Sequence, residues 1–195
     1  MIGQAKRIVL ASASPRRRRL LADLGVEYEL LVPDVDENGV SAATPRELAE
    51  ARALLKAEAA AAAIEEGIAI GADTIVVCDG RVLGKPKDED DAVRLLETLS
   101  GRTHVVITGV GLCEAGTGRR LVDSAETRVT FRRLARDEIE RYVATGEPMD
   151  KAGAYGIQSK GALLVEGIVG DYFNVVGLPL VLLDRMLREF GVRLL

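Results

Sequence analysis

The chain has 195 residues, the length of one compact domain or of two small lobes. Its content of 48% hydrophobic and 29% charged residues is typical of a globular protein with a real core, which excludes disorder as the main description. The net charge of −4, the 4% of aromatic residues and the absence of Trp argue against a nucleic-acid partner.

The first elements alternate between strand and helix. The apolar run Arg7 to Ala11 predicts a strand, and Ser14 caps a helix that has Pro15 in its first turn and stops at Gly25. A second strand is expected from about Val26 to Val32.

An alanine-rich helix is expected next, from Glu47 to Glu66. Thr44, Pro45 and Glu47 supply its N-cap, a proline in the first helical position and the glutamate of a capping box. Gly67 ends this helix.

A buried strand is predicted from Ile68 to Val77, and Asp79-Gly80 turns the chain into a short partner strand at Arg81 to Leu83. The acidic first turn of Asp88 to Leu99 is typical of a helix. The pattern then predicts a long hairpin of two strands, Thr103–Glu114 and Arg119–Phe131. It is followed by a helix at Asp137–Ala144, a strand at Leu163–Val169 and a last helix at Leu180–Phe190. Because strands and helices interleave throughout, we predict an α/β fold with a mixed sheet and flanking helices.

Cysteine and histidine are scarce. Cys78 and Cys113 are too few for a disulfide framework or a cysteine-rich zinc site, and we expect both to be buried free thiols. The single histidine, His104, excludes a His-rich metal cluster and is expected to make a structural hydrogen bond. No apolar run approaches the roughly 18 residues that span a bilayer. We therefore expect a protein of the reducing cytoplasm with no membrane partner.

Two arginines lie where the helix dipole disfavours them. Arg16 and Arg17 are in the first turn of the first helix, directly after the loop Ser12 to Pro15. Exposed amides, the hydroxyls of Ser12 and Ser14 and two guanidinium groups at one spot suit a phosphate. The neighbouring arginines, residues 18 and 19, are better explained as a solvated basic face.

Several other polar residues allow more than one interpretation. The acidic loop ending at Glu37 is either solvated or a metal site, and Asp73 in its apolar strand either pairs with an arginine or has a chemical role. Taken singly, Lys85 is an ordinary loop lysine, and Lys56 on its alanine-rich helix is expected to extend its amine to solvent. Together, however, cations, carboxylates able to hold Mg²⁺, and the base-binding groups of Thr74 and Gln158 favour hydrolysis of a nucleoside triphosphate.

Six segments in order along the chain resemble the Maf family of nucleoside triphosphate pyrophosphatases. They are Ser12–Arg17, Gly71–Thr74, Leu83–Pro86, Ser100–His104, Gly146–Gln158 and Asn174–Pro179. The resemblance implies an elongated two-lobed fold, similar to that of inosine triphosphate pyrophosphatase, with a single domain over residues 1–195 and a central nucleotide cleft. It also implies hydrolysis to monophosphate and pyrophosphate with a divalent cation, Mg²⁺ or Mn²⁺, and a possible homodimer.

The resemblance also assigns roles to residues. The string Asp-Lys-Ala-Gly-x-Tyr-x-Ile-Gln, present here from Asp150 to Gln158, marks the branch that acts on dTTP and UTP. Ser159 departs from the family, which often has Gly after this glutamine, and its added side chain is expected to affect the loop conformation or the grip on the substrate. The expected catalytic residues are Asp73, Lys56 and Lys85. The expected substrate-binding residues are Ser12, Ser14, Arg16, Arg17, Thr74 and Gln158. Glu37 and Asp73 are expected to hold the metal ion.

Two rival functions stay open. One is a nucleotide-binding regulator of septum formation without useful turnover, because the family is linked to inhibition of septum formation. The other is a pyrophosphatase that clears modified nucleotides. Nucleic-acid binding through the arginine run is disfavoured by the acidic net charge.

Overall fold

The computed structural model describes residues 6–195. Two compact units make up the chain: unit 1 holds residues 6–73, Thr108–Ala125 and Gly177–Leu195, and unit 2 holds Thr74–Ile107 and Glu126–Val176.

The elements in chain order are β1 (Ile8–Ala11), α1 (Pro15–Asp23), β2 (Glu29–Leu30), α2 (Pro45–Ala62), β3 (Ile68–Cys78), β4 (Arg81–Leu83), α3 (Glu89–Leu99), β5 (Thr103–Glu114), β6 (Arg120–Phe131), α4 (Arg136–Val143), the 3₁₀ turns η1 (Glu147–Asp150), η2 (Ala152–Ala154) and η3 (Ser159–Leu164), β7 (Val165–Val169), α5 (Tyr172–Val176) and α6 (Leu180–Glu189).

Within the described residues, seven strands form one mixed sheet of order β2-β1-β3-β5-β6-β7, with β4 paired to β3. In unit 1, β1 runs parallel to both β2 and β3. In unit 2, β3 pairs antiparallel with β4, and β6 pairs antiparallel with β7. The predicted α/β fold class with a mixed sheet is therefore confirmed.

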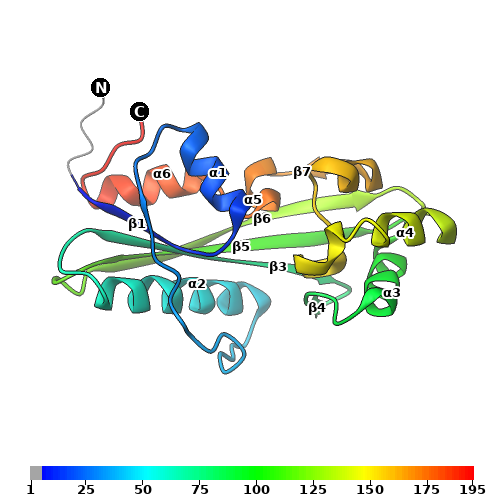
Figure 1. The fold of residues 1–195 in the computed structure, drawn as a ribbon, viewed down its shortest axis with the longest axis horizontal. Coiled ribbons are helices and arrows are strands. Elements are labelled where there is room, and N and C mark those ends of the chain that lie inside the picture. Colours follow the sequence, from blue (N-terminus) through cyan, green and yellow to red (C-terminus); the bar gives the residue numbers. More distant parts are fainter. Residues whose placement is uncertain (1–5) are drawn as a thin grey trace. The chain divides into compact units, whose positions relative to one another are not determined.

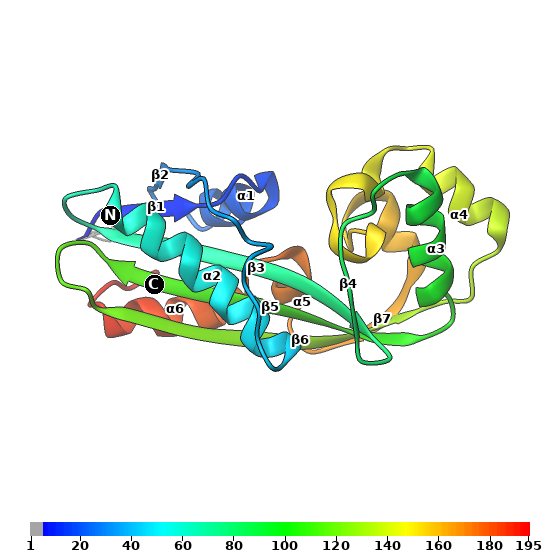
Figure 2. The ribbon, with the colours of Figure 1, turned by 90° about the horizontal axis from the view of Figure 1, so that it is seen from below.

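In unit 1, α2 packs closely on the sheet because small residues meet on both sides. A methyl group added at Gly71 would lie 2.1 Å from the carbonyl oxygen of Ala53, and one added at Gly109 would lie 2.4 Å from that of Ala49. The helix therefore lies almost in backbone contact with β3 and β5. Figure 1 shows α2 on one face of the unit 1 strands and α1 and α6 on the other, and Figure 2 views the same strands from the α2 side.

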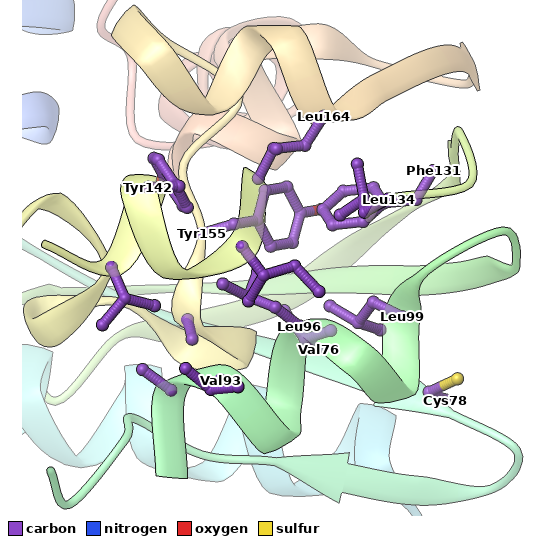
Figure 3. Close-up of a cluster of buried hydrophobic side chains, with 14 of the residues drawn as sticks. Val76, Cys78, Val93, Leu96, Leu99, Phe131, Leu134, Tyr142, Tyr155 and Leu164 are labelled. Atoms are coloured by element: carbon purple, nitrogen blue, oxygen red, sulfur yellow. The ribbon is translucent and has the colours of Figure 1, made fainter. Parts of the chain in front are cut away.

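Unit 2 has its own hydrophobic core. Buried side chains of α3, α4 and the 3₁₀ turns pack against β3, β5 and β6 (Figure 3). His104, Phe131 and Tyr155 meet edge to face, with ring centroids 4.7–5.3 Å apart. The Nε2 atom of His104 is 2.7 Å from the Tyr155 hydroxyl, so the expected structural hydrogen bond is confirmed. Cys78 and Cys113 are buried free thiols, also as expected.

Most predicted elements lie within two residues of the observed bounds, and two differ by more. The strand expected from Val26 to Val32 is only β2, because the Val26 amide donates to the Leu21 carbonyl, 3.1 Å away, and closes α1. The alanine-rich helix ends four residues early, where the Ala63 amide bonds back to Ala60. The strand expected from Leu163 begins only at Val165, because residues 163 and 164 end the 3₁₀ turn η3, and neither α5 nor the 3₁₀ turns were expected.

No helix within residues 6–195 has both the length and the apolar character needed to cross a membrane.

Candidate active site

A buried lysine joins two carboxylates in unit 1. Lys56 on α2 has its ammonium 2.9 Å from Asp73 Oδ1, 2.7 Å from Glu37 Oε2 and 3.3 Å from the Ala72 carbonyl oxygen. Its side chain is only 10% exposed. The interpretation of Lys56 as a lysine extended to solvent was therefore wrong. The close approach of α2 to Gly71, two residues before Asp73, brings the lysine stem to the strand.

Asp73 combines burial with an unused acceptor. Its side chain is 12% exposed, and its Oδ2 atom is buried without a hydrogen-bond partner among the described residues. The Nη1 atom of Arg52 lies 3.9 Å from that oxygen. The sequence left open whether Asp73 pairs with an arginine, caps a turn or has a chemical role, and in the structure its close ion pair is with Lys56. A buried carboxylate oxygen in cationic surroundings is suited to hold a metal ion or to accept a proton from water.

The start of α1 is organised by two serines and an arginine. Ser14 is the N-cap, with its hydroxyl 3.5 Å from the Arg17 amide, and Ser12 Oγ accepts from the Ser14 amide at 3.2 Å. The Arg17 guanidinium donates to Ser12 Oγ at 3.1 Å and to the Gly177 carbonyl at 2.7 Å. These bonds fix the guanidinium in one place beside the helix terminus.

Arg17 also interacts electrostatically with the carboxylates of Asp73 and Glu37. Burial lowers the pKa of Arg17 from its ordinary value, and the charges of Asp73 and Glu37 oppose that shift, whereas the charge of Arg16 adds to it. Arg16, Arg17, Asp73 and Glu37 are therefore near enough to interact electrostatically. Within unit 1 the structure thus brings together the predicted residues Ser12, Ser14, Arg16, Arg17, Glu37, Lys56 and Asp73.

The remaining predicted residues belong to unit 2. Thr74 directly follows Asp73 on β3, and Lys85 is exposed in the loop after β4. The Gly84 carbonyl next to Lys85 accepts from the Gly153 amide at 3.0 Å, which links this loop to the segment that ends at Gln158. The side chain of Gln158 is exposed.

Sequence reasoning did not single out Arg52 or Tyr142, and it named Glu147 only as part of the segment Gly146–Gln158. Arg52 lies one helical turn before Lys56, and this i, i+4 spacing was the available signal. Glu147 and Tyr142 make hydrogen bonds to the backbone around Gln158. Tyr142 has the helical spacing of a core residue on α4, and Glu147 lies in a turn without a periodic pattern, so neither pattern points to these hydrogen bonds.

The carboxylates of this site suit a hard cation whose other ligands come from a substrate. Within residues 6–195 no group of three or more His, Cys, Asp or Glu side chains could hold a metal ion. Asp73 and Glu37 are two carboxylates, one with the unpartnered oxygen described above, and they already share the Lys56 ammonium. Mg²⁺ is commonly held by one or two carboxylates together with substrate phosphates. Asp73 and Glu37 match that pattern.

Comparison with known proteins identifies relatives along nearly the whole chain. The sequence model of the family described as "Maf-like protein" matches residues 7–190. A protein of Moorella thermoacetica named "dTTP/UTP pyrophosphatase" is 57% identical over 186 residues, covering 95% of this chain and 96% of the relative. Proteins with the same name from Dictyoglomus turgidum and Symbiobacterium thermophilum are 51% and 52% identical, covering 97% and 95% of this chain and 99% and 95% of the relatives.

One solved structure supports the fold. The Ham1 protein of Staphylococcus aureus is similar with a TM-score of 0.54, at 20% sequence identity, over 94% of this chain and 99% of that protein. This likeness agrees with the predicted similarity to the inosine triphosphate pyrophosphatase fold.

Proposed function

Because the chain belongs to the Maf family, we propose that it is a pyrophosphatase that hydrolyses dTTP and UTP to the monophosphate and pyrophosphate. The observation that carries this proposal is the buried Lys56–Asp73 pair, in which one carboxylate oxygen has no hydrogen-bond partner within residues 6–195. The names of relatives that are 51–57% identical over almost their full lengths support the choice of substrate.

Asp73 is the catalytic carboxylate in this proposal. Water attacks the α-phosphorus, the bond from that phosphorus to the bridging oxygen breaks, and pyrophosphate leaves with the electron pair of that bond. The attacking water gives its proton to Asp73 Oδ2, the unpartnered oxygen. Lys56, bonded to the other oxygen, holds the carboxylate in one rotamer.

The cations stabilise the charge that develops on the phosphates. Arg16 and Arg17 lie at the start of α1, where backbone amides and the helix dipole also favour an anion. Ser12 and Ser14 orient this region, since both hydroxyls make hydrogen bonds within it. Positioning and electrostatic stabilisation supply most of the rate in phosphoryl transfer.

The family resemblance places Thr74 and Gln158, together with Arg16, among the specificity residues and Lys85 among the further polar residues of the site. In this proposal Lys85 neutralises the phosphates, and Thr74 and Gln158 bind the pyrimidine ring. A pyrimidine offers carbonyl and N–H groups, which a hydroxyl and a carboxamide can match. These assignments stay predictions from the sequence.

A divalent cation completes the proposed site. Asp73 and Glu37 would hold Mg²⁺ or Mn²⁺ together with the substrate phosphates, and the ion would neutralise the phosphate charge as pyrophosphate leaves. We further propose that residues 1–195 act as one domain of a cytoplasmic protein that forms a homodimer, with neither a nucleic acid nor a membrane as partner.

The test is pyrophosphate release by the purified protein with Mg²⁺ or Mn²⁺ over dTTP, UTP, CTP, GTP and 7-methyl-GTP. We expect release from dTTP and UTP, and at least a thousandfold loss of turnover in Asp73→Asn, which keeps the shape of the side chain but is a far weaker base. Wild-type turnover in correctly folded Asp73→Asn would contradict the assignment of Asp73. Nucleotide binding without any product would instead indicate a binding regulator, and a preference for modified nucleotides would indicate a clearing role.

A further inference from the structure

Residues 156–161 of unit 2, called here the Gln158 loop, close on themselves. A methyl group added at Gly161 would lie 2.1 Å from the Gly156 carbonyl oxygen, so the two ends of the loop are in contact. Gln158 and Ser159 lie between these ends, and both are exposed. Ser159 has a φ of +54°, a left-handed conformation that a residue other than glycine keeps only where its surroundings hold it.

The carboxylate of Glu147 holds one end of this loop. Its Oε1 atom accepts from the Gly161 amide at 3.0 Å, and its Oε2 atom is 3.3 Å from the Lys160 amide. Hydrogen bonds from backbone amides to an ionised carboxylate are stronger than those between neutral groups. Glu147 therefore fixes the chain directly after Ser159.

Tyr142 connects the same carboxylate to the other end. Its hydroxyl donates to Glu147 Oε1 at 3.0 Å and accepts from the Gly156 amide at 3.3 Å. The ring of Tyr142 is 5% exposed and belongs to the unit 2 core (Figure 3). Glu147 and Tyr142 thus tie both ends of the Gln158 loop to a rigid part of the protein.

Glu147 is itself well anchored. Its amide donates to Thr145 Oγ1 at 3.2 Å, and its carbonyl oxygen accepts from the Lys151 ammonium at 2.6 Å. Pro148 follows it and is buried, which restricts the backbone further. A fixed carboxylate can impose one conformation on the loop that it holds.

From these contacts we propose that Glu147 is a positioning residue for recognition of the nucleotide base. It acts through the Gln158 loop and keeps the carboxamide of Gln158 in one place, although Glu147 itself does not touch the nucleotide. This role rests on the proposed function, in which Gln158 recognises the pyrimidine ring. Preorganisation of a loop lowers the cost of ordering it on binding, so its loss weakens binding of the base more than it changes the chemical step.

The test compares steady-state kinetics of the full-length wild type, Glu147→Gln and Tyr142→Phe. Glutamine keeps the shape of Glu147 but has only one acceptor oxygen, and phenylalanine keeps the buried ring but lacks the hydroxyl. We expect KM for dTTP and UTP to rise about tenfold in either variant, with kcat within about twofold and a smaller preference over GTP. Glu189→Gln, an exposed glutamate of unit 1, is the matched control and should match the wild type.

Unchanged KM values, or a loss of kcat that is equal on all nucleotides, would overturn the positioning role. If the wild type releases no pyrophosphate from any nucleotide, the proposed function fails, and equilibrium binding then decides the positioning role separately. Weaker binding of dTTP by Glu147→Gln with unchanged binding of inorganic tripolyphosphate would support it, because tripolyphosphate has no base. Equal binding of dTTP by the variant and the wild type would overturn it.

Discussion

The ammonium of Lys56 lies 2.9 Å from the Asp73 carboxylate, and both residues are buried in unit 1. Breaking a buried ion pair by removal of one partner leaves the other charge uncompensated, which is far more costly than losing a surface pair. Lys56 therefore has two effects that can be measured separately, one on stability and one on the carboxylate that the proposed reaction uses.

Lys56→Met should lower the free energy of unfolding by about 3 kcal/mol, because methionine fills a similar volume but leaves Asp73 without its ammonium. Urea unfolding followed by circular dichroism measures this change. Lys87→Met, at an exposed lysine, is the control and should stay within about 0.5 kcal/mol of the wild type. A Lys56→Met protein as stable as the wild type would show that the pair contributes nothing net to folding.

The packing of α2 on β3 should be as sensitive as the ion pair. Gly71→Ala would place a methyl group 2.1 Å from the Ala53 carbonyl and 3.1 Å from Lys56 Cβ, so the helix must move away from the strand. We expect a loss of about 3 kcal/mol or more in unfolding free energy, together with lower turnover in the fraction that folds. Gly167→Ala, where the methyl group meets nothing within 4 Å, should change neither by a comparable amount.

The sequence predicted the regular elements well because their signals are local. The capping box at Thr44 and Glu47 is present with both of its hydrogen bonds, and the helix that follows Asp88 has the expected acidic first turn. The hairpin of β5 and β6 follows from alternation and turn glycines in the same way. Such signals depend on neighbouring residues alone.

The candidate site was less predictable because its contacts join distant parts of the chain. Lys56 was expected in solvent, since nothing in its own helix shows that Gly71 brings the strand close enough for Asp73 to reach it. Glu147 holds amides 13 and 14 residues away in a segment of 3₁₀ turns, where no hydrophobic period exists. The family resemblance, rather than residue patterns, was what placed Lys56 in the site.

Ser159→Gly should stabilise the protein. Ser159 has a φ of +54° and is exposed, so glycine relieves the left-handed strain without loss of packing, while the greater freedom of glycine in the unfolded chain offsets part of the gain. We expect a net gain of about 0.5 kcal/mol in unfolding free energy, measured by urea denaturation. Ser41→Gly, at an exposed serine without positive φ, is the control and should be neutral or slightly destabilising. A loss of stability in Ser159→Gly would show that the backbone at Ser159 is not strained.

The single histidine predicts a specific dependence of stability on pH. Burial lowers the pKa of His104 from 6.5 to about 4, and its Nδ1 atom has no hydrogen-bond partner within the described residues. The unfolded chain therefore binds a proton at this residue between about pH 6.5 and pH 4, where the folded protein does not. Stability from the neutral imidazole is complete above pH 6.5 and decreases as the pH falls through this window.

From these values, acidification from pH 7.5 to pH 5 should cost the wild type about 2 kcal/mol through His104, in addition to any cost from carboxylates. His104→Gln removes the titrating group while leaving a polar atom to meet the Tyr155 hydroxyl, so its unfolding free energy should fall by about 2 kcal/mol less over the same range. Urea unfolding of both proteins at pH 7.5, 6 and 5 measures the difference, and carboxylate effects cancel because both chains carry the same carboxylates. Equal pH dependences in the two proteins would mean that His104 binds its proton as readily in the folded state as in the unfolded chain, and the aromatic cluster around it would then have to admit a charge.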